Sequence, residues 1–162
     1  MTYQRNSHCS YCGMRFRGGQ PWPRRCASCA QSSYLNPLPV AVLLLPIDGG
    51  LLLVRRAIPP QIGLLALPGG FIDIDESWQA AAARELYEEA GITIDPETIS
   101  EFMVCSAPAG MVLIFGIAPP LSAAVLPPFA PNSEASERLV LHSFAELAFP
   151  LHTEAAARYF AG

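Results

Sequence analysis

Residues 70–92 read Gly-Phe-Ile-Asp-Ile-Asp-Glu-Ser-Trp-Gln-Ala-Ala-Ala-Ala-Arg-Glu-Leu-Tyr-Glu-Glu-Ala-Gly-Ile, and this stretch decides how the chain is interpreted. Four consecutive alanines predict a helix over residues 77–90. Ser77 is a favoured N-cap and Gly91 a favoured residue just past the helix end. Glu85, Glu88 and Glu89 follow one another at helical spacing, so their carboxylates share one face of that helix.

Three carboxylates on one helix face conflict with local electrostatics. Like charges at this spacing repel, and the helix C-terminus, where they lie, also disfavours negative charge. A bound cation removes the conflict, and carboxylate oxygens suit Mg2+ or Mn2+. A solvated acidic face would explain the three glutamates, but it would not explain the arginine and the glycines around them. The segment therefore predicts a divalent-cation site.

The same segment resembles the Nudix box, G-x5-E-x7-R-E-U-x-E-E-x-G-U, in which U is an aliphatic residue. It matches at every defined position, namely Gly70, Glu76, Arg84, Glu85, Leu86, Glu88, Glu89, Gly91 and Ile92. The resemblance implies a Nudix fold, an α/β/α sandwich with a mixed sheet between helices. It also implies a metal-dependent pyrophosphohydrolase that acts on a nucleoside diphosphate linked to another group.

The resemblance also assigns roles to single residues. Its catalytic set is Glu85, Glu88, Glu89, Arg84 and Glu76, in which Arg84 orients a metal-binding glutamate and Glu76 supports the loop. Its set of ligands for Mg2+ or Mn2+ is Gly70, Glu85, Glu88, Glu89 and Glu137, with Glu134 as a lesser candidate. The metal neutralises the diphosphate and lowers the pKa of a bound water. A carboxylate accepts the proton, and the sequence leaves the identity of that base open.

Four cysteines form two pairs, Cys9-x-x-Cys12 and Cys26-x-x-Cys29, separated by thirteen residues. Two such knuckles complete a closed tetrahedral site of four thiolates, which is typical of structural zinc. A segment of about 30 residues is too short to bury its own core, so the metal would supply its folding energy. Two disulfides are the alternative. The N-terminus shows no secretion signal, which favours zinc and a cytoplasmic protein.

Apolar runs outside the box predict strands. Val40–Leu45 and Leu51–Val54 read as a hairpin, and Pro68-Gly69-Gly70 reads as a sharp turn into a strand at Phe71–Ile74. A last helix is expected at Thr153–Phe160. Mixed strands and helices indicate an α/β sandwich. A polar, proline-containing hinge places the expected domain boundary near Leu35, with a zinc ribbon over residues 1–35 and the Nudix domain over residues 36–162.

Further matches indicate a branch of the family. Tyr34-x-Asn36-Pro37, Leu52–Ala57 and Leu67–Phe71 look like Nudix hydrolases with an N-terminal zinc ribbon, a branch that cleaves NADH, FAD and ADP-ribose. The Ser-Gln-Pro-Trp-Pro-Phe-Pro motif of NADH pyrophosphatases is absent after Ile92, so FAD or ADP-ribose comes before NADH. The alternatives are a housecleaning enzyme for nucleoside triphosphates and a nucleotide-sensing regulator whose ribbon binds nucleic acid.

Three residues are candidates for substrate contact. Arg55 and Arg56 are neighbours on an expected strand, where alternate side chains point to opposite faces, so at most one of them faces the site. Phe71 either stacks on a base or packs in the core, and core packing is the expectation. Specificity in this fold lies in loops, so the sequence leaves the nucleoside diphosphate derivative undecided.

Composition sets the remaining expectations. The 162 residues are 51% hydrophobic and 15% charged, which excludes a disordered chain. A net charge of −4 argues against a nucleic-acid partner. A small basic-aromatic patch, which consists of Arg15, Arg17, Arg24, Arg25, Phe16 and Trp22, is therefore expected to be a solvated loop. No apolar run reaches the roughly 20 residues of a membrane helix. The mean hydropathy of +0.30 suggests a buried interface, and we expect a homodimer.

Overall fold

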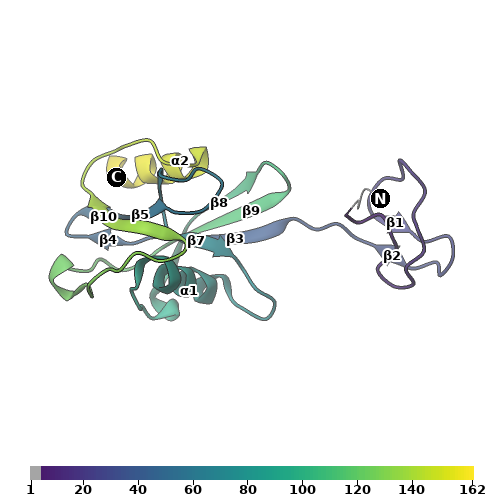
Figure 1. Ribbon diagram of the computed structural model, residues 1–162, viewed down its shortest axis with the longest axis horizontal. Helices are drawn as coiled ribbons and strands as arrows, with labels where there is room; N and C mark the ends of the chain where they lie inside the picture. Colours follow the sequence, from purple (N-terminus) through teal and green to yellow (C-terminus); the bar gives the residue numbers. More distant parts are fainter. Residues whose placement is uncertain (1–4) are drawn as a thin grey trace. The chain divides into compact units, whose positions relative to one another are not determined.

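The computed structural model describes residues 5–162, which form two compact units divided between Pro37 and Leu38 (Figure 1). The N-terminal unit contains two short antiparallel strands, β1 (Arg24–Arg25) and β2 (Ser32–Ser33). Its buried apolar cluster consists only of Cys9, Phe16 and Cys26, with Trp22 and Cys29 packed against it. So small a cluster buries little surface, which is consistent with a unit that depends on its four cysteines.

The strands of the second unit form two four-stranded sheets. One sheet has the order β10-β5-β4, with β6 also paired to β5, and the other has the order β7-β3-β9-β8. The strands are β3 (Leu38–Leu44), β4 (Pro46–Ile47), β5 (Gly50–Arg56), β6 (Leu65–Ala66), β7 (Gly69–Phe71), β8 (Ser100–Ala107), β9 (Met111–Ile117) and β10 (Ala135–Leu141). Strands β3 and β9 run parallel, whereas the other pairs are antiparallel. The sheet β7-β3-β9-β8 is therefore mixed, as predicted.

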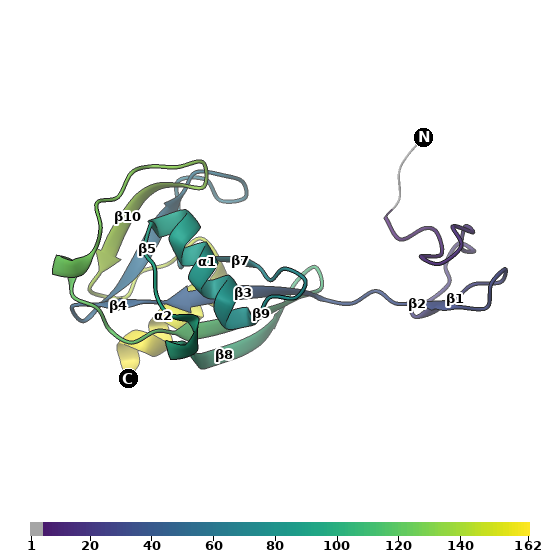
Figure 2. The same ribbon diagram turned by 90° about the horizontal axis from the view of Figure 1, so that it is seen from below.

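Helices cover both faces of the central strands (Figures 1 and 2). Helix α1 (Trp78–Ala90) packs on one face, where Leu86 belongs to the same buried cluster as Leu43 of β3. Helix α2 (Pro150–Ala161) packs on the other, where Ala155 shares a cluster with Leu44. Because alternate side chains of β3 enter opposite clusters, the strand must be apolar at every central position. This explains its unbroken apolar sequence and confirms the α/β sandwich.

Helix α1 follows its sequence signals closely. The Ser77 hydroxyl accepts a hydrogen bond from the Ala80 amide at 3.1 Å, which confirms Ser77 as the N-cap. Gly91 adopts a left-handed conformation with φ of 69°, and its amide donates to the Tyr87 carbonyl. Helix α2 begins three residues before the predicted Thr153, because Pro150 is well suited to the first turn, where its missing amide costs nothing.

The segment before α1 differs from its prediction. Gly69 and Gly70 do not form a turn but pair with β3 as part of β7, and residues 72–74 lie outside any strand. A Cβ atom at Gly69 would collide with the Ala41 carbonyl oxygen of β3. The glycine therefore permits a close approach between two strands, a requirement that a Pro-Gly-Gly sequence does not distinguish from a turn.

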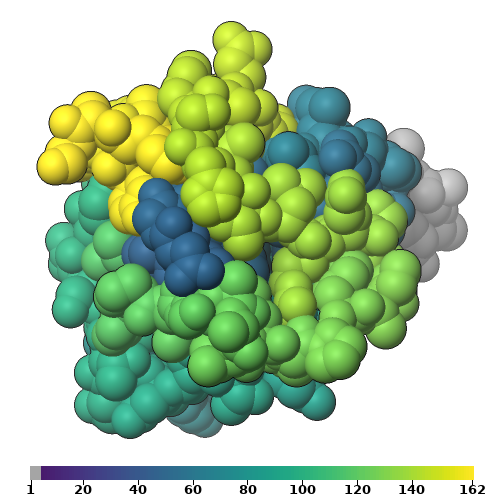
Figure 3. All heavy atoms as spheres, turned by 90° about the vertical axis from the view of Figure 1, so that its left-hand side faces the viewer, coloured from purple at the N-terminus to yellow at the C-terminus, as the bar shows by residue number. Residues whose placement is uncertain are grey.

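The connection that leads into β10 runs along the outside of the second unit. A short 3-10 helix, η2 (Ala123–Val125), interrupts it, and the Asp48 carboxylate accepts a hydrogen bond from the Ala123 amide at 2.9 Å. Figure 3 shows this segment in green beside the blue β4–β5 turn. Among residues 5–162, no helix has the length and apolar character needed to cross a membrane.

Candidate metal centre

Two glutamates of α1 point into the second unit although they are charged. Glu85 and Glu89 are only 8% and 5% exposed, whereas Glu88 faces solvent. Helical spacing puts Glu85 and Glu89 one turn apart on the same face. Burying two like charges side by side is expensive unless something compensates them, so their surroundings identify what this face is built to hold.

Arg84 supplies part of that compensation. Its guanidinium donates to both carboxylate oxygens of Glu76, each at 3.0 Å, and to the Phe71 carbonyl at 3.0 Å. It also donates to Glu85 at 2.8 Å and to Glu88 at 3.1 Å. These contacts lower the pKa of Glu76 and raise that of Arg84, in both cases mainly through the Arg84–Glu76 hydrogen bonds. One side chain thereby fixes the loop before α1 to the glutamates on the helix.

Strand β7 closes the site from the other side. The Gly69 amide donates to Glu89 Oε2 at 3.1 Å. A Cβ atom at Gly70 would overlap the Glu85 carboxylate, so this position accepts only glycine without displacing that group. The two glycines therefore bring backbone against both buried glutamates, and the match of Gly70 to the box gains a steric reason.

The third carboxylate comes from the loop before β10. Asn132 donates to the Glu88 carbonyl at 2.9 Å and to the Glu89 carbonyl at 3.3 Å, at the end of α1. Its side-chain oxygen accepts from the Glu134 amide at 2.9 Å and from the Ala135 amide at 2.8 Å. Asn132 thus fastens the loop to the helix end and delivers Glu134. The sequence does not mark Asn132 as a site residue, because nothing local indicates a contact with residues more than forty positions away.

Glu85, Glu89 and Glu134 form the candidate metal centre. One carboxylate oxygen from each lies within 4.8 Å of the others. Burial raises the pKa of Glu89 to about 8, against the Gly69 amide, and the negative charges of Glu85 and Glu134 act in the same direction as burial. Burial likewise raises the pKa of Glu85, against the hydrogen bonds from Arg84. Clustered hard oxygens that resist ionisation without a cation are a donor set that fits Mg2+ or Mn2+.

Other expected ligands lie elsewhere. Glu88 is bound to Arg84 and half exposed. Glu137 pairs with Arg55 at 2.7 Å instead of joining the buried glutamates. The pairing of β10 with β5 shifts between Ala135 and Glu137, which sets Glu137 opposite Arg55. Among the residues that the structure describes, it is therefore Glu134 that completes the cluster with the two helix glutamates.

The three candidate substrate residues also differ in their partners and in their relation to the buried glutamates. Arg55 is held by Glu137 and by the Gly63 carbonyl. Arg56 donates to the Pro60 carbonyl at 2.8 Å, and its charge opposes the rise in the pKa of Glu89 that burial causes. Of these two candidate arginines, Arg56 is thus the one whose charge acts on a glutamate of the metal centre. Phe71 is 55% exposed, so the expected core packing is wrong, and its ring stands free next to Gly70.

A buried histidine supports the centre from α2. The Leu67 amide donates to His152 Nδ1 at 3.2 Å, so the imidazole is neutral with its proton on Nε2. Burial, together with a smaller effect from the charge of Arg56, lowers the pKa of His152 to about 3. Leu67 leads directly into the two glycines that contact Glu85 and Glu89. His152 therefore anchors the segment that shapes the centre, a role that its sequence context does not reveal.

The four paired cysteines converge in the N-terminal unit. Their sulfur atoms lie within 4.8 Å of one another, with Cys9 Sγ 3.7 Å from Cys29 Sγ and Cys12 Sγ 3.6 Å from Cys26 Sγ. Sulfurs bound tetrahedrally at about 2.3 Å stand about 3.8 Å apart, so the spacing suits zinc. The pKa of Cys9 falls to about 6 because backbone amides, first that of Tyr11, donate to its sulfur. Backbone hydrogen bonds likewise lower the pKa of Cys26, so one cysteine of each pair favours the thiolate form that binds a metal.

Comparison with known proteins gives one family. The NUDIX domain profile matches residues 36–160. Among curated proteins, the NAD-capped RNA hydrolase NudC of Edwardsiella ictaluri is 32% identical over 93 residues, which cover 57% of this chain and 36% of that protein. The Shigella flexneri protein of the same name is 28% identical over a stretch of the same length. The matched part thus spans little more than a third of these relatives.

Solved structures agree on the fold. A NUDIX hydrolase from Nitrosomonas europaea has a TM-score of 0.77 and 27% identity, over 96% of this chain and 90% of that one. A bifunctional NMN adenylyltransferase/ADP ribose pyrophosphatase from Francisella tularensis, complexed with AMP and a manganese ion, has a TM-score of 0.55 and 25% identity. That match covers 64% of this chain and 33% of the other.

Proposed function

The chain belongs to the NUDIX domain family, and we propose that it is a divalent-cation-dependent pyrophosphohydrolase that splits a nucleoside diphosphate derivative into two monophosphates. The observation that carries the proposal is the cluster of Glu85, Glu89 and Glu134, whose oxygens lie within 4.8 Å of one another. Two of the three are buried on one helix face, an arrangement that costs stability unless a cation occupies it.

Glu85, Glu89 and Glu134 would hold Mg2+ or Mn2+, which supplies charge neutralisation of the diphosphate and a bound water of lowered pKa. The chain's own residues prepare the place for that chemistry. Arg84 fixes the Glu85 carboxylate, the Gly69 amide fixes that of Glu89, and Asn132 fixes the loop of Glu134. Ligands held before the substrate arrives need no rearrangement during the reaction.

The substrate proposal rests on the relatives and on two side chains near the metal centre. The curated relatives carry names for hydrolysis at an NAD cap, and one solved neighbour is named for ADP-ribose. Both compounds contain adenosine diphosphate joined to a second group. Arg56 supplies positive charge near Glu89, and the exposed Phe71 ring next to Gly70 offers a face for a base. We therefore place FAD, ADP-ribose and related dinucleotides first, and we assign a zinc ribbon to the N-terminal unit.

Hydrolysis of a small panel tests the proposal. FAD, ADP-ribose, NADH, NAD+ and 8-oxo-dGTP are incubated with the full chain and Mg2+ or Mn2+, and the products are identified. Glu89→Gln keeps the size of the side chain but removes its charge, and we expect activity to fall more than about 100-fold, the upper range for loss of a mere outer-shell partner. Glu154→Gln, an exposed position on α2, is the matched control.

Each outcome decides between functions. Two monophosphates from a dinucleotide, lost in Glu89→Gln and retained in Glu154→Gln, support the proposal and name the substrate. Release of inorganic pyrophosphate from 8-oxo-dGTP alone would instead make the protein a triphosphate hydrolase. Full activity of Glu89→Gln, or activity that survives removal of divalent cations, would overturn the assignment of the metal centre.

A further inference from the structure

Charge is divided unevenly between the two units. Residues 1–37 contain five of the ten arginines and none of the fourteen acidic residues of the chain. Four thiolates around one Zn2+ would carry two negative charges and leave this unit positive. The acidic balance of the whole chain, which argued against a nucleic-acid partner, therefore does not describe the N-terminal unit, which the structure shows to be a compact body of its own.

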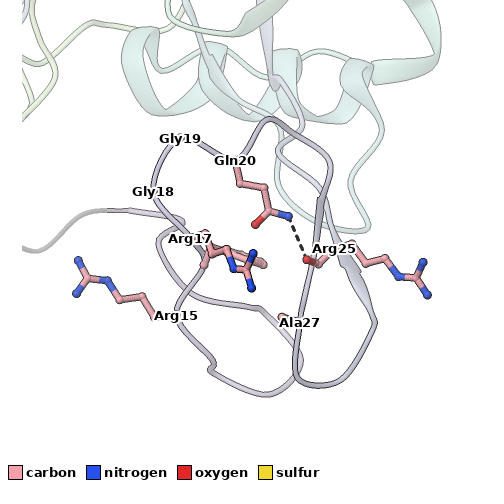
Figure 4. A pocket seen from close by; sticks show the side chains of 8 residues that line it. Arg15, Arg17, Gly18, Gly19, Gln20, Arg25 and Ala27 are labelled. Atoms are coloured by element: carbon pink, nitrogen blue, oxygen red, sulfur yellow. Dashed lines mark hydrogen bonds between the residues drawn. The ribbon is translucent and has the colours of Figure 1, made fainter.

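Three of the five arginines of this unit lie at the lining of a cavity of about 480 Å³, with the side chains of Arg15 and Arg25 extending outward on opposite sides of it (Figure 4). Three arginines line it, together with the Gly18–Gly19 backbone, Gln20 and the apolar side chains of Phe16 and Ala27; the arginines are Arg15, Arg17 and Arg25. The Gln20 amide donates to the Arg25 carbonyl at 3.1 Å and closes the loop. Ligand cavities in proteins commonly have volumes of roughly 300–1,000 Å³, so this one has room for part of a polymer strand.

The arginines around the cavity have donors to spare. Arg24 is occupied, because it donates to the Gln20 and Asn6 carbonyls at 2.8 and 3.1 Å. By contrast, the exposed side chains of Arg15 and Arg17 form no hydrogen bond or ion pair with any residue of the described chain, and the Arg25 side chain donates only through its Nε. Planar guanidinium groups with free N–H donors match the oxygens of a phosphate.

The two aromatic residues beside these arginines, Phe16 and Trp22, offer little open ring surface to a base. The Arg24 guanidinium lies 4.4 Å from the centre of the Trp22 ring, and Phe16 is buried and packs edge-on against Trp22. Gly18 and Gly19, in contrast, leave open space where a Cβ would stand, so a phosphate can come close to their backbone. This combination favours contact with the sugar-phosphate chain over contact with bases.

We propose that the N-terminal unit binds single-stranded nucleic acid through its backbone phosphates, at the cavity lined by Arg15, Arg17 and Arg25. This function goes beyond the proposed hydrolysis and is carried by another unit. A duplex is a poorer fit, because residues 5–37 contain no helix that could enter a major groove, and the β1–β2 pair, with two residues in each strand, is too short to lie along one. With the phosphates as the main contact, binding depends strongly on salt and little on base sequence.

Fluorescence anisotropy of a labelled 12-nucleotide oligouridylate, titrated with the full chain at several KCl concentrations, tests the proposal. No Mg2+ is added, so the result does not depend on hydrolysis. The triple variant R15Q/R17Q/R25Q is expected to bind at least about tenfold more weakly at low salt and to flatten the slope of log K against log salt by about 2, since each lost phosphate contact removes about 0.7. R158Q, an exposed arginine on α2, is the matched control.

Further arms identify the anion. R15K/R17K/R25K keeps the charge and is expected to retain most of the salt dependence, whereas equal loss in the Lys and Gln variants would contradict a phosphate-backbone site. Competition by inorganic phosphate or pyrophosphate at the strength of the oligonucleotide would show a site for free anions. Equal competition by polyglutamate would show a site for acidic peptides. Equal loss in the Lys and Gln variants and either of these competition results would overturn the proposal. It would also be overturned if R158Q bound as weakly as the triple variant.

Discussion

Single residues set the electrostatics of the metal centre. Glu89 resists ionisation because it is buried, and the Gly69 amide is the hydrogen bond that opposes this effect. His152 resists protonation for the same reason, because an imidazolium would lie among Phe115, Phe149 and the Leu67 amide. Both groups are therefore neutral in the absence of a cation, and each links the charge state of one side chain to the stability of the surrounding fold.

Acid should weaken the fold through His152. Its pKa is about 3 in the folded chain and near 6.5 in the unfolded chain, so between these values the unfolded state binds more protons. The stability that His152 contributes is present above about pH 6.5 and is lost as the pH falls toward 3, with a slope of at most about 1.4 kcal/mol per pH unit. Urea unfolding across pH 4–7 measures it.

His152→Asn provides the comparison. An Asn side chain can still accept from the Leu67 amide but does not titrate, and it loses the contacts with Phe115 and Phe149. We expect this variant to be less stable than the native chain by about 2–4 kcal/mol at pH 7, as for loss of a large buried side chain. The difference in the free energy of unfolding between the native chain and this variant should narrow as the pH falls to 4. A difference in stability that stays constant across this range would mean that His152 has the same pKa in the folded and the unfolded chain.

The metal centre is formed by helix α1 and by the loop before strand β10. Helix α1 brings Glu85 and Glu89, and the loop before β10 brings Glu134. Arg138 of β10 donates to the Ala90 carbonyl at 2.7 Å, so the helix end is capped from the same direction. The geometry of the centre thus depends on how the C-terminal turn of α1 is attached to the start of β10.

Asn132→Ala tests this attachment. The variant loses two donors to the helix end and one acceptor for the loop amides, and we expect a loss of about 1–3 kcal/mol in stability. Affinity for Mn2+, measured by calorimetry, should fall roughly 10–100-fold, because Glu134 is no longer held. Asn36→Ala, an exposed asparagine, is the control and should change neither quantity. Unchanged Mn2+ affinity in Asn132→Ala would remove Glu134 from the ligand set.

Local signals predicted α1 and its caps, because capping and helical spacing act over a few residues. The sequence favoured Glu137 over Glu134, a choice that depends on an irregularity in the pairing of β10 with β5. It also offered no hint of His152, whose partner Leu67 lies 85 positions away. The general pattern is that contacts within a turn of helix can be inferred from sequence, whereas contacts that close large loops need the folded chain.

The whole molecule consists of units with different sources of stability. The second unit has two large buried clusters, but the N-terminal unit has a cluster of three residues around its cysteines. The four sulfurs therefore take the place of a core there. Since the two units are separate compact bodies, the loss of one cysteine should affect them unequally.

Cys26→Ser should disrupt only the N-terminal unit. We expect zinc content, measured by mass spectrometry of the purified protein, to fall well below that of the native chain, and amide exchange in residues 5–37 to become fast. The melting temperature of the second unit should stay within about 2 °C, because no buried residue there is changed. Cys105→Ser, the cysteine outside the pairs, should leave zinc content unchanged. Retained zinc in Cys26→Ser would contradict the four-thiolate site.

The parallel pairing of β3 with β9 also dictates an order of events during synthesis. Residues 38–44 cannot complete their pairing until residues 111–117 have left the ribosome. Until then, one edge of an almost wholly apolar strand is unpaired, a state prone to aggregation that chaperones shield. The four paired cysteines and the small buried cluster around them all lie within the first 37 residues, so that unit can fold first. During synthesis, the N-terminal unit would therefore be folded while the sheet that contains β3 is still incomplete.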